Sequence, residues 1–253
     1  MALRHPPQHK TDLVLKLIVR ALCHGPNCLA PPMVASLLTA APRPRHSLCI
    51  QTIETRVSYA RPSSLPEAIR LLQAGPARVL AGGTDLYPTA GDTLSGPVVD
   101  LTAIPGLRGF RPHNGGLRIG ACTTWSDIAE ADLPPGLAAL QQAALQVGGR
   151  QIQNAGTIGG NLCNASPAAD GVPPLLALEA AVALTGPDGT RSLPLGQFIT
   201  GPRRTALQPG EILTAITLPS PALTGRSAFV KLGARAHLVI SIAMVAARIS
   251  LEQ

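Results

Sequence analysis

Two glycine-rich segments contain the residues best suited to hold a phosphorylated ligand. The first, residues 80–86, reads Leu-Ala-Gly-Gly-Thr-Asp-Leu and directly follows a short apolar run. Glycines lack a Cβ atom, so the backbone can wrap closely around an oxyanion, and consecutive N–H groups can form a concave anion site. Thr84 adds a hydroxyl donor. The same pattern is also typical of an ordinary tight turn, so both interpretations stay open from this segment alone.

The second segment, residues 154–170, is longer and rich in small polar residues. Its many backbone polar groups need partners, and a bound polar ligand could supply some of them. An irregular turn capped by Asn and Ser side chains is an equal alternative. The segment is not a P-loop, because no Gly-Lys-Ser/Thr follows, and the Gly-x-Gly-x-x-Gly fingerprint of dinucleotide-binding folds is missing.

The first segment lies in a predicted β–α–β-like unit. Ser64, Pro66 and Glu67 have the spacing of a helix start, which predicts a helix over residues 66–73. Apolar runs predict short buried strands at residues 78–81 and 98–101. The glycine turn would therefore follow a strand directly.

The second segment lies among a different set of predicted elements. We expect a strand at residues 117–120, a helix beginning after Thr123 or Thr124, and an Ala/Leu helix over residues 137–147. A glycine-rich loop is predicted for residues 148–164. Gly-Pro-Asp-Gly at residues 186–189 predicts a hairpin turn, and residues 212–218 alternate as a strand does.

Composition indicates a globular protein that carries most of its excess charge near its start. Hydrophobic residues make up 45% and aromatic residues 2% of the 253 residues, and the net charge is +7. Residues 1–56 hold seven of the 21 Lys and Arg but only two of the 14 Asp and Glu. Because the rest of the chain has no basic cluster and few aromatic residues, we expect no nucleic-acid partner.

Cysteine usage and hydropathy indicate the compartment. The five cysteines are scattered, which argues against a disulfide scaffold and favours a reducing, cytoplasmic location. No apolar run reaches the length of a membrane span. Neither the cysteines nor the histidines have metal-ligand spacing, so we predict no metal or iron–sulfur site in this chain.

Residues 1–55 differ in amino-acid composition from the rest of the chain. They are basic and proline-rich, with little periodicity beyond residues 13–22. We expect a disordered or non-native extension, with an organelle-targeting segment as the alternative.

Four strings, in the same order along the chain, resemble the flavin subunits of the xanthine dehydrogenase/carbon monoxide dehydrogenase family of molybdenum hydroxylases. The resemblance covers residues 57–253, and the strings are AGGTDL, IGACTTWSDI, IQNAGTIGGNLCNASPAAD and FVKLGARAHLVISIAMVAARI. It implies an α+β fold: a two-subdomain flavin domain of the p-cresol methylhydroxylase type over residues 56–221, with subdomains at about 56–108 and 109–221. A truncated α+β C-terminal domain would occupy residues 222–253.

The resemblance also implies which residues bind FAD. The first segment resembles the family's pyrophosphate-binding turn, and the second resembles the opposite wall around the diphosphate and ribityl chain. Asp170 resembles an acidic residue on the adenosine side, Ile212 or Leu213 an apolar residue near the cofactor, and Lys231 a lysine near the flavin ring. The predicted FAD-binding residues are Ala81, Gly82, Gly83, Thr84, Asp85, Thr157, Gly159, Gly160, Asn161, Asn164, Ser166, Asp170, Leu213 and Lys231.

Lys231 has one further observation in its favour. It is the only lysine after residue 56. A cation beside a flavin favours the anionic reduced form and so tunes its potential. A strand-edge lysine in water is the alternative.

The implied function is electron transfer through FAD. Electrons would arrive from [2Fe–2S] clusters in a small partner subunit, ultimately from a molybdopterin-binding large subunit, and would pass to NAD or a quinone. We expect no catalytic acid or base in this chain. The alternatives are a truncated assembly subunit with weak or no FAD binding, and a basic binding protein.

The chain ends early relative to the pattern of this family. Residues 238–251 predict a strand whose hairpin partner is missing, which would leave an exposed apolar edge.

Overall fold

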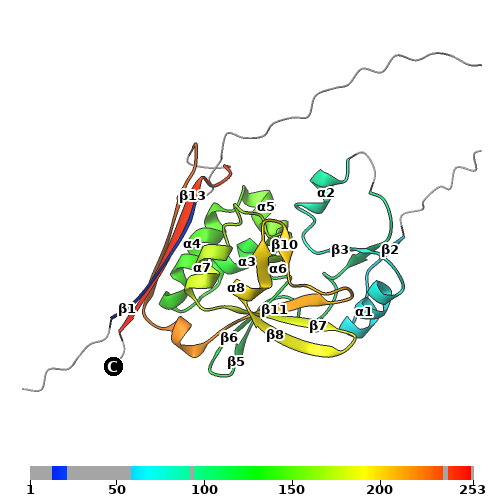
Figure 1. The fold of residues 1–253 in the computed structure, drawn as a ribbon, viewed down its shortest axis with the longest axis horizontal. Helices are drawn as coiled ribbons and strands as arrows, with labels where there is room; N and C mark the ends of the chain where they lie inside the picture. Colours follow the sequence, from blue (N-terminus) through cyan, green and yellow to red (C-terminus); the bar gives the residue numbers. More distant parts are fainter. Residues whose placement is uncertain (1–12, 22–57, 92–93, 236–238, 252–253) are drawn as a thin grey trace, which may run out of the picture.

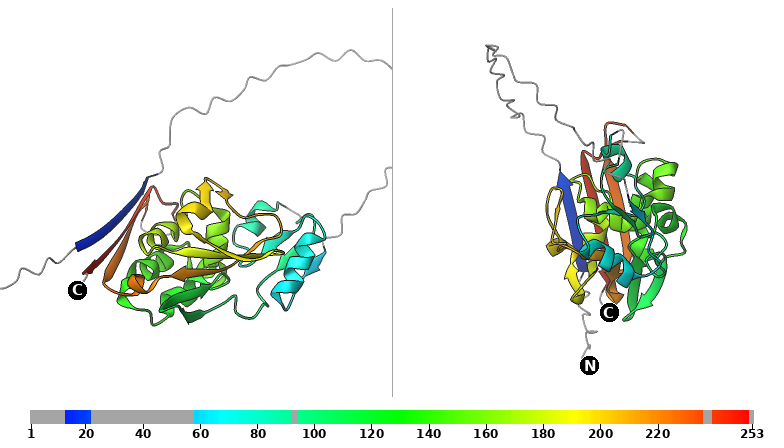
Figure 2. Two further views of the ribbon diagram at one scale, coloured as in Figure 1. Left: turned by 60° about the horizontal axis from the view of Figure 1, so that its bottom comes forward. Right: turned by 90° about the vertical axis from the view of Figure 1, so that its right-hand side faces the viewer.

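Four sheets and the helices packed beside them make up the described part of the fold. The computed structural model describes residues 13–21, 58–91, 94–235 and 239–251. A five-stranded sheet and the helices beside it form the centre, with a small parallel unit at one end and a three-stranded sheet at the other (Figures 1 and 2). This mixture of helices and strands agrees with the predicted α+β class. Among the described residues, no helix is long and apolar enough to cross a membrane.

The parallel unit contains the first glycine-rich segment. Its strand order is β2-β4-β3, with both pairs parallel. The Ser64 side chain caps α1 by accepting a hydrogen bond from the Glu67 N–H, so the helix begins where the sequence predicts it. The strand before the glycine turn is less buried than expected, because only Leu80 of its three residues is buried. The elements are β2 (Tyr59–Ala60), α1 (Leu65–Gln73), β3 (Arg78–Leu80), α2 (Leu86–Thr89) and β4 (Val98–Asp100).

The central sheet has the antiparallel order β5-β6-β11-β7-β8. Its strands alternate, so that Ile119, Val182 and Ile216 face the main core while their neighbours face the other side. The predicted strands at 117–120 and 212–218 pair directly, and the predicted hairpin turn joins β7 to β8. The strands are β5 (Phe110–His113), β6 (Gly116–Gly120), β7 (Ala181–Gly186), β8 (Gly189–Pro194) and β11 (Ile212–Leu218).

Helices cover the core face of this sheet and include most of the second glycine-rich segment. The loop predicted for residues 148–164 is wrong, since α5 and α6 occupy much of it. Thr157 caps α6 by accepting from the Gly160 N–H, and a Cβ atom on Gly159 would lie 2.6 Å from the Ala121 carbonyl oxygen. Close packing on that carbonyl therefore stabilises a helix that glycine alone disfavours. The helices are α3 (Trp125–Glu130), η1 (Pro135–Leu137), α4 (Ala138–Gln146), α5 (Arg150–Ala155), α6 (Ile158–Asn164), α7 (Val172–Ala177) and α8 (Leu195–Phe198).

The three-stranded sheet packs against α4 and α7, and its order is β1-β13-β12. In this contact, Phe229 and Met244 meet alanines of the two helices. A small hairpin and a 3-10 turn connect the sheets. These remaining elements are β1 (Leu13–Ala21), β9 (Ile199–Gly201), β10 (Arg204–Thr205), η2 (Ser220–Leu223), β12 (Arg226–Leu232) and β13 (Ala243–Leu251).

β13 is the central strand of this sheet, which corrects one expectation. It pairs with β12 on one side and with β1 on the other, from Leu13 opposite Leu251 to Ala21 opposite Ala243. The strand predicted to lack a partner therefore has two. Within the leading segment, residues 13–21 form β1, which pairs with the open edge of β13. The rest of residues 1–55 lies outside the described residues.

Candidate cofactor site

A cavity of about 550 Å³ lies between the parallel unit and the helical layer. Residues 79–86, from the last two residues of β3 to the first residue of α2, form one wall. Residues of α5, α6 and the segment 121–125 form the opposite wall, and the start of β11 closes one side. Both glycine-rich segments therefore meet at one cavity of ligand-binding size.

The first wall is a tight turn whose shape depends on glycine. A Cβ atom on Gly82 would overlap the Ala155 carbonyl oxygen, and Gly83 has a φ of +71°, which favours glycine. Within the described part of the chain, the N–H groups of Gly82, Gly83 and Thr84 have no hydrogen-bond acceptor. The turn thus offers consecutive backbone donors at the cavity, which suits an anion.

The second wall is the first turn of α6. The Ile158 N–H donates to the Thr123 carbonyl at 3.0 Å, and the Gly159 N–H donates to the Ala121 carbonyl at 2.9 Å. These bonds fix the helix on the strand end that precedes α3. Asn161 lines the cavity, and its Oδ1 atom is buried without a hydrogen-bond partner in the described residues. Such an acceptor is costly unless a ligand or water satisfies it.

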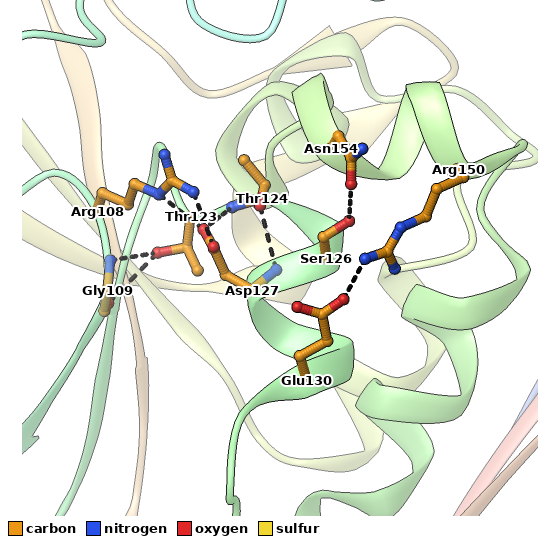
Figure 3. A network of polar contacts seen from close by, with 9 residues as sticks. All are labelled: Arg108, Gly109, Thr123, Thr124, Ser126, Asp127, Glu130, Arg150 and Asn154. Carbon is orange, nitrogen blue, oxygen red and sulfur yellow. Dashed lines mark hydrogen bonds and ion pairs between the residues drawn. The ribbon is translucent and has the colours of Figure 1, made fainter.

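A polar network beside this wall holds α3 and α5 in place (Figure 3). Thr124 and Asp127 form a capping box at the start of α3, and Arg108 donates to both Asp127 oxygens at 2.8 Å. Burial alone would raise the pKa of Asp127, but hydrogen bonds from Arg108 and Thr124 lower it below its ordinary value. Ser126 donates to Asn154 at 2.6 Å, so α5 is tied to α3.

A bridge of three side chains connects the two walls directly. The Asn164 Nδ2 group donates to Asp85 Oδ1 at 2.7 Å, and Arg203 donates to Asn164 Oδ1. The Arg203 N–H also donates to the Ala165 carbonyl at 2.8 Å, so the β9–β10 turn rests on the end of α6. Both side-chain hydrogen bonds of this bridge are exposed, so an entering ligand can rearrange them.

Eleven of the fourteen predicted site residues line this cavity. Ser166, Asp170 and Lys231 do not. Ser166 instead accepts a local hydrogen bond from the Ala168 N–H at 3.3 Å. The lining residues from the prediction are Ala81, Gly82, Gly83, Thr84, Asp85, Thr157, Gly159, Gly160, Asn161, Asn164 and Leu213.

Asp170 and Lys231 form a buried ion pair with each other. The Lys231 Nζ atom lies 2.8 Å from Asp170 Oδ2, and Ser241 donates to Asp170 Oδ1 at 2.6 Å. Lys231 also donates to the Gln146 carbonyl at 3.1 Å. The two side chains are therefore in direct contact with each other, and neither lines the cavity.

Several cavity residues were not singled out from the sequence. Trp125, the only tryptophan, is buried and lines the cavity together with Ala121 and Cys122. All three belong to the quoted string IGACTTWSDI, which was the signal available for them. Burial raises the pKa of the Cys122 thiol to about 11, so it stays protonated near neutral pH.

Glu211 also lines the cavity, but its charge is already paired. It accepts from Arg191 Nε at 2.6 Å and from Arg191 Nη2 at 2.8 Å, and these hydrogen bonds lower its pKa. Among the described residues, no group of three or more His, Cys, Asp and Glu side chains could hold a metal ion.

The fold and the cavity define an α+β domain with one ligand-sized cavity between two glycine-rich walls. Comparison with known proteins gives the family: residues 53–221 match the FAD binding domain in molybdopterin dehydrogenase. The chain belongs to this family, as a medium-chain FAD subunit of the molybdenum hydroxylases, and its cofactor is FAD.

Two curated relatives show the same membership. The nicotinate dehydrogenase FAD-subunit of Eubacterium barkeri is 38% identical over 193 residues, which cover 73% of this chain and 65% of that subunit. The carbon monoxide dehydrogenase medium chain of Afipia carboxidovorans is 38% identical over 179 residues, which cover 69% and 62%. The chain thus spans just under two thirds of the length of these relatives.

Solved structures agree with the sequence comparison. A chain of the Cu,Mo-CO dehydrogenase matches with a TM-score of 0.69 at 34% identity, covering 77% of this chain and 74% of that one. Quinoline 2-oxidoreductase from Pseudomonas putida 86 matches with a TM-score of 0.68 at 28% identity, covering 77% and 73%. All of these relatives are dehydrogenases or oxidoreductases.

Proposed function

We propose that this chain is the FAD-binding electron-transfer subunit of a molybdenum hydroxylase. The observation that carries the proposal is the single cavity into which both predicted FAD-binding segments project residues. We include in it the two-subdomain arrangement of the p-cresol methylhydroxylase type. The separate parallel unit and antiparallel sheet, with the cavity beside both, support that arrangement.

The residues present suit FAD. The unpaired N–H groups of the Gly82–Gly83–Thr84 turn would hold the pyrophosphate, since they supply backbone donors without the bulk of a Cβ atom. Asn161, which lines the cavity, would contact the ribityl chain. Leu213 and Trp125 supply apolar surface in the same cavity, as a planar ring system requires.

We propose that Asp170 and Lys231 act on the cofactor from behind the cavity wall. Lys231 holds the carbonyl of Gln146, and the next residue, Val147, lines the cavity. The pair therefore fixes the end of α4 where it meets the site. It also ties that end to β12 and Ser241.

When bound, FAD supplies the redox chemistry, by accepting electrons and passing them on. The chain's own residues bind and orient it. The Cys122 thiol stays protonated, and the Glu211 carboxylate is paired with Arg191. Neither residue is therefore a free acid or base in the cavity. We accordingly expect substrate hydroxylation to take place on another polypeptide.

The partners and acceptor complete the proposal. A [2Fe–2S] small subunit would deliver electrons from a molybdopterin-binding large subunit, and NAD or a quinone would receive them. The relatives are described as subunits or chains of larger dehydrogenases, which supports partners of this kind. A cytoplasmic location belongs to the proposal as well, supported by the free thiols of Cys122 and Cys163.

The test is an FAD titration of the purified chain, followed by absorbance and by flavin fluorescence. We expect one equivalent of FAD to bind. Gly83→Val should weaken binding by about tenfold or more, because a branched side chain would collide with Tyr87 and strain a positive φ. A chain that binds no FAD, alone or with its partner subunits, would favour the assembly-subunit alternative. Polyanion binding that survives deletion of residues 1–55 would favour the basic binding protein.

A further inference from the structure

A second cavity, of about 620 Å³, lies on the outer face of the central sheet. Leu65 and residues 104–107 of the parallel unit form one side of it. Arg118 and Thr217 form part of the other side, and their neighbours Ile119 and Ile216 face the core. None of its lining residues lines the cofactor cavity, so the two are separate spaces.

Two arginines converge in this cavity. Arg111 and Arg118 are directly opposite each other in the β5–β6 pair, which places their Cβ atoms about 5 Å apart. Arg118 Nη1 donates to the Gly106 carbonyl at 3.2 Å, and the Arg111 guanidinium lies 3.8 Å from where a Cβ atom on Gly106 would be. Both guanidinium groups therefore reach the same glycine.

No carboxylate balances this pair in the described part of the chain. Neither arginine takes part in an ion pair there, and no Asp or Glu lines the cavity. A third lining arginine, Arg191, is already paired with Glu211. Like charges directly opposite on a sheet are destabilising. Burial, and then the nearby Arg111 charge, hold the pKa of Arg118 below its ordinary value.

The remaining lining groups indicate the kind of ligand. Thr185 and Thr190 bring their hydroxyl oxygens within 3.0 Å of each other, and Ser192 adds another hydroxyl. No Phe, Trp or Tyr lines the cavity, so a nucleobase has no stacking surface. Guanidinium forks with hydroxyl groups match the oxygens of a phosphate.

We propose that this second cavity binds a phosphate group through Arg111 and Arg118. The ligand is either free phosphate or pyrophosphate, or the phosphate of a larger metabolite whose remainder lies toward the open rim near His113. The site is independent of FAD, because it shares no residue with the cofactor cavity.

The test is isothermal titration of the full chain with inorganic phosphate and pyrophosphate, at constant ionic strength in chloride. We expect Arg111→Gln and Arg118→Gln each to weaken binding by about tenfold or more. Arg70→Gln is the matched control, since Arg70 is exposed on α1, carries the same charge and lies outside the cavity. It should change affinity by less than about twofold.

A thermal melt adds a readout that distinguishes a binding role from a structural one. Without phosphate, Arg118→Gln should melt at or above the wild-type temperature, because a like-charge repulsion is removed. With phosphate, the wild type should gain stability and the variant should not. The proposal would be overturned if the chain bound no phosphate, or if the wild type and both arginine variants bound it with equal affinity. It would also be overturned if only Asn164→Ala, at the first cavity, lost phosphate binding. Ribose 5-phosphate that binds more tightly than phosphate would identify a larger metabolite as the source.

Discussion

Single glycines decide how closely backbone segments approach one another around the cofactor cavity. Gly82 lies against the Ala155 carbonyl, and Gly159 lies against the Ala121 carbonyl. Each therefore permits a backbone-to-backbone contact that any other residue would block. The sequence shows these glycines but not their neighbours, because Ala121 and Ala155 become neighbours only through the tertiary fold.

Gly82→Ala tests this close approach. The added methyl group would overlap the Ala155 carbonyl oxygen, so the two walls must separate. We expect a loss of about 2 kcal/mol or more in the free energy of unfolding, and weaker FAD binding. Urea denaturation and FAD titration measure the two effects. Gly196→Ala is the control, since the nearest atom to its added Cβ would be at an ordinary 3.8 Å. Equal stability of the two variants would contradict the argument.

At the scale of elements, the sequence predicts the helix starts that depend on nearby residues, but not the helix that depends on tertiary packing. Ser64 and Thr124 cap helices where the sequence predicts them, because a cap depends on residues three positions apart. α6 was predicted as loop, because its glycines disfavour a helix until Gly159 packs on Ala121. Ten of the eleven predicted cavity residues lie in the two glycine-rich segments, whereas the contact between Asp170 and Lys231 joins distant parts of the chain.

The ion pair between Asp170 and Lys231 should hold β12 to the loop before α7. Asp170→Asn and Lys231→Met each leave one buried group without its partner, which costs about 3 kcal/mol. The double variant should lose less than the sum of the two, because no unpaired charge remains. Each single variant should also bind FAD about tenfold more weakly, through displacement of the end of α4. Additive losses in urea denaturation would show that the two side chains act separately.

For the molecule as a whole, the ends of the described chain meet in one sheet. β1 and β13 are more than two hundred residues apart in the sequence, yet they lie side by side (Figure 1). No local pattern specifies such a pairing, and the apolar run at residues 13–22 was its only signal. β13 is paired with a neighbouring strand along both of its edges, and its inner face packs on α4 and α7. The leading segment thus belongs to the folded molecule through β1.

Deletion of residues 1–21 tests the role of β1 in closing this sheet. Without β1, the outer edge of β13 presents unpaired N–H and C=O groups, which invite pairing with a second chain. We expect concentration-dependent self-association in sedimentation velocity and a lower melting temperature. Deletion of residues 1–12 is the matched control, because it keeps β1 and should behave as the full chain does. FAD affinity should fall little in either deletion, since β1 contributes no residue to the cofactor cavity. If the longer deletion stays monomeric and melts with the shorter one, β1 does not protect the edge of β13.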